Sequence, residues 1–135
     1  MAPDETLLSI IIPTFNEEAA IGDVLVAIHE LNLPQTEVLV VDDGSTDATA
    51  RVAEAAGARV ISHPYNIGNG AAVKTGIRSA RGRVLVFLDG DGQHDPHDIP
   101  KLVAHVSRYH MVVGARQRGS QIFLHRSIAN FVYNQ

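Results

Sequence analysis

The strongest constraint on the fold is a repeated alternation between short apolar runs and segments with helical spacing. Continuous runs rich in β-branched residues occupy residues 7–12, 37–41 and 83–88, as is typical of strands buried on both faces of a parallel sheet. A segment with the periodicity of a helix follows each run. The pattern predicts an α/β fold, a mostly parallel sheet flanked by helices and joined by right-handed crossovers.

Further elements are expected between and after these runs. The first helix should begin after Asn16 as its N-cap, and the second, over residues 46–56, after Ser45. The remaining expected elements are strands over 59–62 and 111–114 and helices over 71–80, 99–109 and 123–133. At 135 residues and 45% hydrophobic content, the chain has the size of one domain.

Composition excludes several classes of partner. A net charge of -4 argues against a general nucleic-acid binder, and the absence of cysteine excludes disulfides and thiolate metal sites. The acidic N-terminus does not resemble a secretory signal, and no run approaches the roughly 20 apolar residues of a membrane span. We expect a cytoplasmic protein, or one at the cytoplasmic face of the membrane; peripheral membrane association and a homo-oligomer stay open.

The segment FLDGDGQHDP directly follows the apolar run that ends at residue 88. Asp89 and Asp91 stand two residues apart between glycines, and carboxylates in such a turn suit Mg²⁺ or Mn²⁺, with Gln93 as a further ligand. The alternative is a hydrated acidic turn. A calcium loop of the EF-hand type is excluded, because His94 stands where that loop needs glycine and Pro100 where it needs glutamate. Residues 95–98 should start the next helix.

Two more polar segments should reach the same edge, because ligands of such sheets bind beyond the carboxyl ends of the strands. In VVDDGSTD, Asp42 and Asp43 could accept hydrogen bonds from a base or a ribose, or could belong to a helix start; we assign capping to Ser45 and ligand contact to Asp43. PTFNEE, residues 13–18, has the same two interpretations.

The glycine-rich segment NIGNGAAVKTG, residues 66–76, matches neither nucleotide fingerprint. Val73 stands where the dinucleotide-binding and the P-loop patterns both need glycine. A helix that begins near Asn69 could still hold a diphosphate through its backbone N–H groups. Arg116, Arg118 and Arg126 are either phosphate ligands or a solvated basic patch.

Four segments together resemble the inverting glycosyltransferases of family 2, which have the GT-A fold. They are SIIIPTFNEEAAI, VLVVDDGSTDAT, NIGNGAAVKTGI and VLVFLDGDGQHDP, in the family's order and at its usual separations. The resemblance covers about residues 7–116. DGDGQHDP is most similar to the branch that transfers a sugar from a nucleotide to a polyprenyl phosphate, such as dolichol-phosphate mannosyltransferase.

This resemblance implies roles for particular residues. Asp89, Asp91 and Arg116 would be catalytic, and Mg²⁺ or Mn²⁺ would bind Asp89, Asp91 and Gln93. The UDP- or GDP-linked sugar would contact Pro13, Phe15, Glu17, Asp42, Asp43, Gly70 and Asp89. Arg116 and Arg126 would meet the phosphate of a lipid acceptor. Many relatives have lysine where this chain has Asn69, so a charged contact to the diphosphate is not expected there.

The implied reaction is a single displacement at the anomeric carbon, with inversion. Catalytic domains of the family are considerably longer, so we expect residues 1–135 to be the nucleotide-sugar-binding N-terminal part of a domain that is incomplete at its C-terminus. Two alternatives stay open: a nucleotide-sugar-binding module without transferase activity, and a sugar-phosphate nucleotidyltransferase. The acidic PTFNEE argues against the second, which would need a basic, glycine-rich loop after the first strand.

Overall fold

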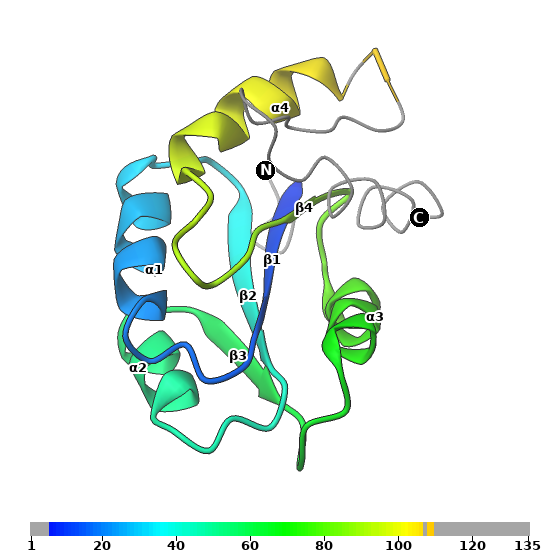
Figure 1. The fold of residues 1–135 in the computed structure, drawn as a ribbon. Helices are drawn as coiled ribbons and strands as arrows, with labels where there is room; N and C mark the ends of the chain where they lie inside the picture. The colour runs from blue at the N-terminus through cyan, green and yellow to red at the C-terminus, as the bar shows by residue number, and fades with distance from the viewer. Residues whose placement is uncertain (1–5, 107, 110–135) are drawn as a thin grey trace, which may run out of the picture.

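A computed structural model describes residues 6–106 and 108–109. Within them a parallel sheet has the strand order β3-β2-β1-β4, and helices cover both of its faces (Figure 1). The strands are β1 (Leu8–Thr14), β2 (Thr36–Asp42), β3 (Arg59–Ser62) and β4 (Val84–Phe87). The helices are α1 (Ile21–Glu30), α2 (Thr49–Ala55), α3 (Asn69–Ser79), the 3-10 turn η1 (Pro96–Asp98) and α4 (Ile99–His105).

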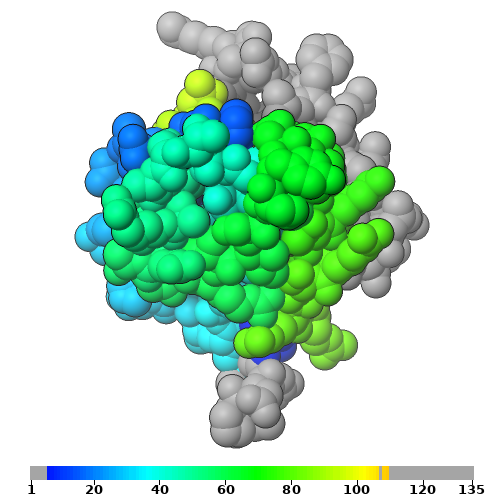
Figure 2. All heavy atoms as spheres, turned by 90° about the horizontal axis from the view of Figure 1, so that it is seen from below, coloured from blue at the N-terminus to red at the C-terminus, as the bar shows by residue number. Residues whose placement is uncertain are grey.

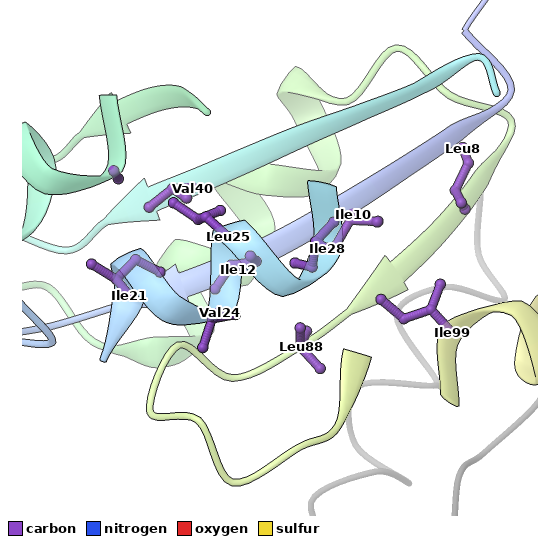
Figure 3. Close-up of a cluster of buried hydrophobic side chains, with 11 residues drawn as sticks. Leu8, Ile10, Ile12, Ile21, Val24, Leu25, Ile28, Val40, Leu88 and Ile99 are labelled. Atoms are coloured by element: carbon purple, nitrogen blue, oxygen red, sulfur yellow. The ribbon is translucent and has the colours of Figure 1, made fainter. Parts of the chain in front are cut away.

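The central strand β1 is buried along its whole length, which explains its continuous apolar sequence. Alternate side chains point to opposite faces of the sheet. Ile10 and Ile12 pack with Ile21, Leu25 and other residues of α1 on one face, as Figure 3 shows. The strand's other face belongs to a second apolar cluster, formed with α3.

Helix α3 lies unusually close to β1. A Cβ atom on Gly76 would fall far inside the contact distance of the Ile11 side chain, so only glycine allows this approach. Ala72, one turn earlier, is also buried against this face of the sheet. The close packing fixes where the N-terminus of α3 meets the ends of the strands.

The strand order creates a switch point between β1 and β4. The chain places β2 and β3 on one side of β1 and then returns to add β4 on the other side. The strand order therefore reverses at β1, and in open α/β sheets ligands bind beyond the carboxyl ends of the strands at such a point. Figure 2 views the molecule from below Figure 1, the side on which the loops after β1, β2 and β3 lie.

The expected parallel α/β architecture is confirmed, and so are the strands near residues 7–12, 37–41, 59–62 and 83–88. The expected N-caps are wrong: α1 begins at Ile21 and α2 at Thr49, and neither has a side-chain cap. The strand expected over 111–114 and the helix over 123–133 lie outside the described residues. In the described part, no helix has the length and apolarity needed to cross a bilayer.

Candidate functional site

A cleft of ≈ 350 Å³ lies at the switch point. Its walls come from the end of β1, the loop after β4, and the start of α3 with the loop before it. The residues that line it are Pro13, Thr14, Phe15, Glu17, Asp43, Asn66, Gly68, Asn69, Ala72, Asp89, Gly90 and Asp91. With Asp43, which follows β2, the parallel topology thus brings together four segments that are far apart in the sequence.

Polar residues of the loop after β1 form hydrogen bonds with the loop after β2. Asn16 has a φ of 52°, in the left-handed region. Its side chain accepts from the Thr46 N–H at 2.9 Å, while its own N–H donates to the Ser45 hydroxyl at 2.9 Å. Glu18 accepts from the Ala48 N–H at 3.0 Å. These contacts between loops explain why Asn16 and Ser45 do not cap helices.

The intervening residues of the same loop, Phe15 and Glu17, line the cleft. Phe15 leaves 44% of its surface exposed. Burial raises the pKa of the Glu17 carboxyl, and the negative charges of Asp91, Asp47 and Asp89 raise it further. The pKa of Glu17 therefore responds to the acidic loop after β4, more than 70 residues along the chain.

The two neighbouring acids at the end of β2 have different surroundings. Asp42 is buried and accepts hydrogen bonds from both the hydroxyl and the N–H of Ser45. That contact shapes the turn after the strand, and Asp42 is not among the residues lining the cleft. Asp43 is also buried, at 3% exposure, but it does line the cleft.

Asp43 accepts hydrogen bonds from the loop over residues 63–68. His63 contacts its Oδ1 at 2.8 Å, the Ile67 N–H donates to Oδ1 at 3.0 Å, and the Gly68 N–H donates to Oδ2 at 2.8 Å. Burial alone would raise the pKa of Asp43, but these hydrogen bonds outweigh burial and lower it below its usual value. Asp43 is consequently a fixed negative charge beside the cleft.

The loop after β4 carries Asp89 and Asp91, which line the same cleft as Glu17. Gly90, between them, packs against β1: a Cβ there would stand 2.5 Å from the Thr14 methyl carbon. The backbone N–H of Gln93 donates to Asp91 Oδ1 at 2.9 Å, which closes a turn on that carboxylate. Asp95 accepts from the His97 N–H at 2.9 Å at the start of η1, so the expected helix start here is confirmed.

The described lining is strongly acidic. Four carboxylates, those of Glu17, Asp43, Asp89 and Asp91, line the cleft, and its described lining contains no lysine or arginine. No group of three or more His, Cys, Asp or Glu residues in the described part could hold a metal ion unaided. A divalent cation bound at Asp89 and Asp91 would thus need oxygen ligands from water and substrate, which is the usual condition of Mg²⁺.

Most of the residues expected to bind a nucleotide or a metal do meet at this cleft. Those that line it are Pro13, Phe15, Glu17, Asp43, Asp89 and Asp91, whereas Asp42, Gly70 and Gln93 do not. Gly70 lies in the first turn of α3. Arg116 and Arg126 lie outside the described residues.

No role was predicted for His63 from the sequence. The hydrogen bonds from the loop over residues 63–68 to Asp43 were not predicted either. His63 directly follows β3, and every strand of a parallel sheet ends at the same edge. That rule alone places His63 and Asn66 beside the loops after β1, β2 and β4. Asn66 contributes an amide that donates to the carboxylate of Asp43 at 3.1 Å.

Comparisons with known proteins agree with this geometry. The chain is 37% identical over 138 residues to the dodecaprenyl-phosphate galacturonate synthase of Rhizobium johnstonii, covering 94% of this chain and 41% of that protein. It is 37% identical over 118 residues to the undecaprenyl-phosphate 4-deoxy-4-formamido-L-arabinose transferase of Pseudomonas fluorescens, covering 79% of this chain and 34% of that protein. It thus spans less than half the length of either relative.

A solved structure is similar as well. The glucosyl-3-phosphoglycerate synthase of Mycobacterium tuberculosis, solved with Mn²⁺, UDP and glucosyl-3-phosphoglycerate, superposes with a TM-score of 0.66 at 34% identity. The match covers 75% of this chain and 39% of that one. This and the other solved neighbours confirm the expected GT-A architecture.

The family model described as "Glycosyl transferase family 2" matches residues 9–133. This match includes the whole cleft, from Pro13 on β1 to Asp91 after β4. Both sequence relatives carry names of transferases or synthases that use a polyprenyl phosphate. On the extent of this match, the chain belongs to glycosyl transferase family 2.

Proposed function

We propose that this chain is the donor-binding part of a glycosyltransferase that moves a sugar from a nucleoside diphosphate to a polyprenyl phosphate. The observation that carries the proposal is the cleft at the β1/β4 switch point, which Asp89 and Asp91 line together with Phe15 and Glu17. Nucleotides bind at such switch points in open α/β sheets. The names of the two sequence relatives support a polyprenyl phosphate as the acceptor.

The donor set of the cleft fits Mg²⁺ or Mn²⁺. Both ions prefer carboxylate, water and phosphate oxygens, and Asp89 and Asp91 supply carboxylates on the same wall. Gln93 is proposed as a further ligand. When bound, the ion would neutralise negative charge on the departing diphosphate.

The chain's own residues would orient the donor. Phe15 offers an exposed aromatic face on which a base can stack, and Pro13 and Glu17 continue that wall. Asp43 is proposed to contact the base, sharing a carboxylate oxygen that already accepts from the protein. Gly70 and its neighbours at the start of α3 would present backbone N–H groups to the diphosphate.

The reaction we propose is a single displacement. An oxygen of the acceptor phosphate forms a bond to the anomeric carbon while the bond to the diphosphate breaks, and the nucleoside diphosphate leaves with the electron pair. The acceptor phosphate is already an anion at neutral pH, so no general base is needed to activate it. We assign Arg116 and Arg126 to the acceptor phosphate, and Arg116 also to the leaving diphosphate.

Thermal unfolding with nucleotides tests donor binding. UDP and Mn²⁺ are the first pair to try, because the solved neighbour contains both; GDP and Mg²⁺ are the alternatives. A ligand that binds only the native state raises the melting temperature, and Asp91→Ala should abolish the metal-dependent part of that rise. If neither nucleotide shifts the melting temperature with either ion, donor binding is refuted.

Transfer of the sugar to a short polyprenyl phosphate tests the activity itself. Product formation with inverted configuration is the expected result for the proposed enzyme. Nucleotide binding without any transfer would identify this chain as a binding module instead.

A further inference from the structure

The carboxylate of Asp43 is held by a complete set of donors from one loop. His63 and the Ile67 N–H reach Oδ1 at 2.8 and 3.0 Å. The Asn66 amide and the Gly68 N–H reach Oδ2 at 3.1 and 2.8 Å. A carboxylate offers about four acceptor positions, so the position and rotamer of this side chain are determined by the loop around it.

His63 differs from the other donors because its second ring nitrogen also has a hydrogen-bond partner. Its Nε2 lies 2.7 Å from the hydroxyl oxygen of Thr75 on α3, and its side chain is only 10% exposed. An ionised carboxylate can only accept, so Nδ1 must carry the proton that it donates to Asp43. In the neutral ring Nε2 then accepts from the Thr75 hydroxyl, and both nitrogens are satisfied without a charge.

We propose that His63 is a positioning residue for nucleotide binding, which acts by donating its Nδ1–H to Asp43 and so fixing that carboxylate at the wall of the cleft. The inference rests on the proposed function, since the ligand is taken to be the nucleoside diphosphate. It connects three elements: Asp43 follows β2, His63 follows β3, and Thr75 lies on α3. The same bond holds the loop that places Asn66 and Gly68 at the cleft.

The order Asp43, His63, Thr75 resembles the acid–histidine–hydroxyl chain of nucleophilic enzymes. The positions of the acid and the hydroxyl relative to the ligand are reversed, however. In those enzymes the hydroxyl meets the substrate and the acid lies behind. Here Asp43 lines the cleft, while His63 and Thr75 are not among its lining residues. The chain of contacts therefore supports a carboxylate at the ligand rather than activating a nucleophile.

Two near-isosteric substitutions separate the roles of the two ring nitrogens. In His63→Asn the amide nitrogen can take the place of Nδ1, and in His63→Gln it reaches the place of Nε2 instead. We would measure the Kd for UDP with Mn²⁺ by calorimetry for the full chain and both variants, with GDP as the alternative nucleotide. We expect His63→Asn to stay within about threefold of wild type and His63→Gln to weaken binding by about tenfold or more.

A role in folding alone predicts a different pattern, because both variants would then bind normally once folded. Urea unfolding of each variant gives the folded fraction to which every Kd is referred. Equal affinities for His63→Asn and His63→Gln would overturn the proposal, as would wild-type affinity in His63→Gln.

A ligand-free measurement separates this inference from the proposed function. The carboxyl ¹³C shift of Asp43, followed by NMR against pH, reports its pKa directly. Loss of the Nδ1 donor should raise that pKa in His63→Gln and leave it near the wild-type value in His63→Asn. If wild type binds no nucleotide, the proposed function has failed while this titration still decides whether His63 positions Asp43; identical titrations in both variants would refute it.

Discussion

Asp43 is a buried carboxylate that accepts hydrogen bonds from four donors of the loop over residues 63–68. Replacing it with Asn removes the charge and turns an amide N–H₂ group toward donors that the carboxylate accepted from. We expect Asp43→Asn to lower the free energy of unfolding by about 2–3 kcal/mol, the cost of leaving buried donors unpaired. Urea denaturation would measure it. Asp95→Asn is the control, because Asp95 caps η1 from an exposed position and Asn caps as well as Asp; equal losses in both variants would contradict the assignment.

The lowered pKa of Asp43 fixes the sign of a pH dependence. In the unfolded chain the pKa of an aspartate is about 3.9. In the folded protein the pKa of Asp43 is lower. Its stabilising contribution is therefore fully present above the unfolded value and is lost as the pH falls through the folded one. The stability advantage of wild type over Asp43→Asn should shrink as the pH falls below about 4. If the stability difference between wild type and Asp43→Asn increased in acid, the pKa of Asp43 would be raised by folding instead of lowered.

The pKa of Glu17 is shifted in the opposite direction to that of Asp43. Burial and the charges of Asp91, Asp47 and Asp89 raise its pKa, so its ionised form opposes folding at neutral pH. Glu17→Gln should raise the melting temperature of the ligand-free protein slightly, and Mn²⁺ should reduce that gain by neutralising Asp89 and Asp91. Glu18→Gln is the matched control, because Glu18 accepts a hydrogen bond from the Ala48 N–H instead. A lower melting temperature in Glu17→Gln would count against charge repulsion across the cleft.

Helix α3 packs closely against β1 at Gly76. Alanine at Gly76 would press its Cβ into the Ile11 side chain, and overpacking of this kind costs about 1–3 kcal/mol. Gly70 lies in the same helix with nothing within 4 Å of an added Cβ. Gly70→Ala should stabilise the protein by about 0.5–1 kcal/mol, the propensity gain. Urea denaturation compares the two variants; similar values would mean that α3 is free to shift.

The strands were predictable from the sequence, and the helix starts were not. Buried parallel strands leave a local signal, a continuous β-branched run, and β1 and β2 show it. The first turns of α1 and α2 depend on contacts between distant segments: Asn16 is engaged by Ser45 and Thr46, about 30 residues away. A capping rule that considers neighbours in sequence cannot anticipate such contacts.

At the scale of the whole molecule, the residues that form the core differ from those that line the acidic cleft, so we expect a cation to affect ligand binding but not folding. The described core lies between the helices and the sheet and consists of apolar side chains, which do not bind cations. We expect EDTA to leave the melting temperature of the ligand-free protein unchanged and to abolish the rise produced by UDP with Mn²⁺. A chelator that lowered the melting temperature of the ligand-free protein would instead indicate a structural metal.

The position of the site was predictable because parallel topology gathers strand ends, whatever their order in the chain. The sequence predicted ligand contact for Asp43, which lines the cleft, but the contact that Asp42 makes with the turn after β2 was not predicted. Asp42 and Asp43 are adjacent aspartates, yet Asp42 shapes a turn and Asp43 lines the cleft. Only the register of β2 decides which side each faces, and His63 was missed because its partners lie 20 and 12 residues away.

The switch point also makes the cleft depend on a completed sheet. Two of the segments that line it, residues 13–17 and 89–91, follow the first and last strands of the described sheet, and β2 and β3 lie between them in the chain. No partly assembled sheet that lacks β4 can present both segments. If the proposed ligand binds there, the stoichiometry of nucleotide binding in a refolding sample counts the molecules in which β4 has docked beside β1, and a time course of that stoichiometry follows the completion of the sheet.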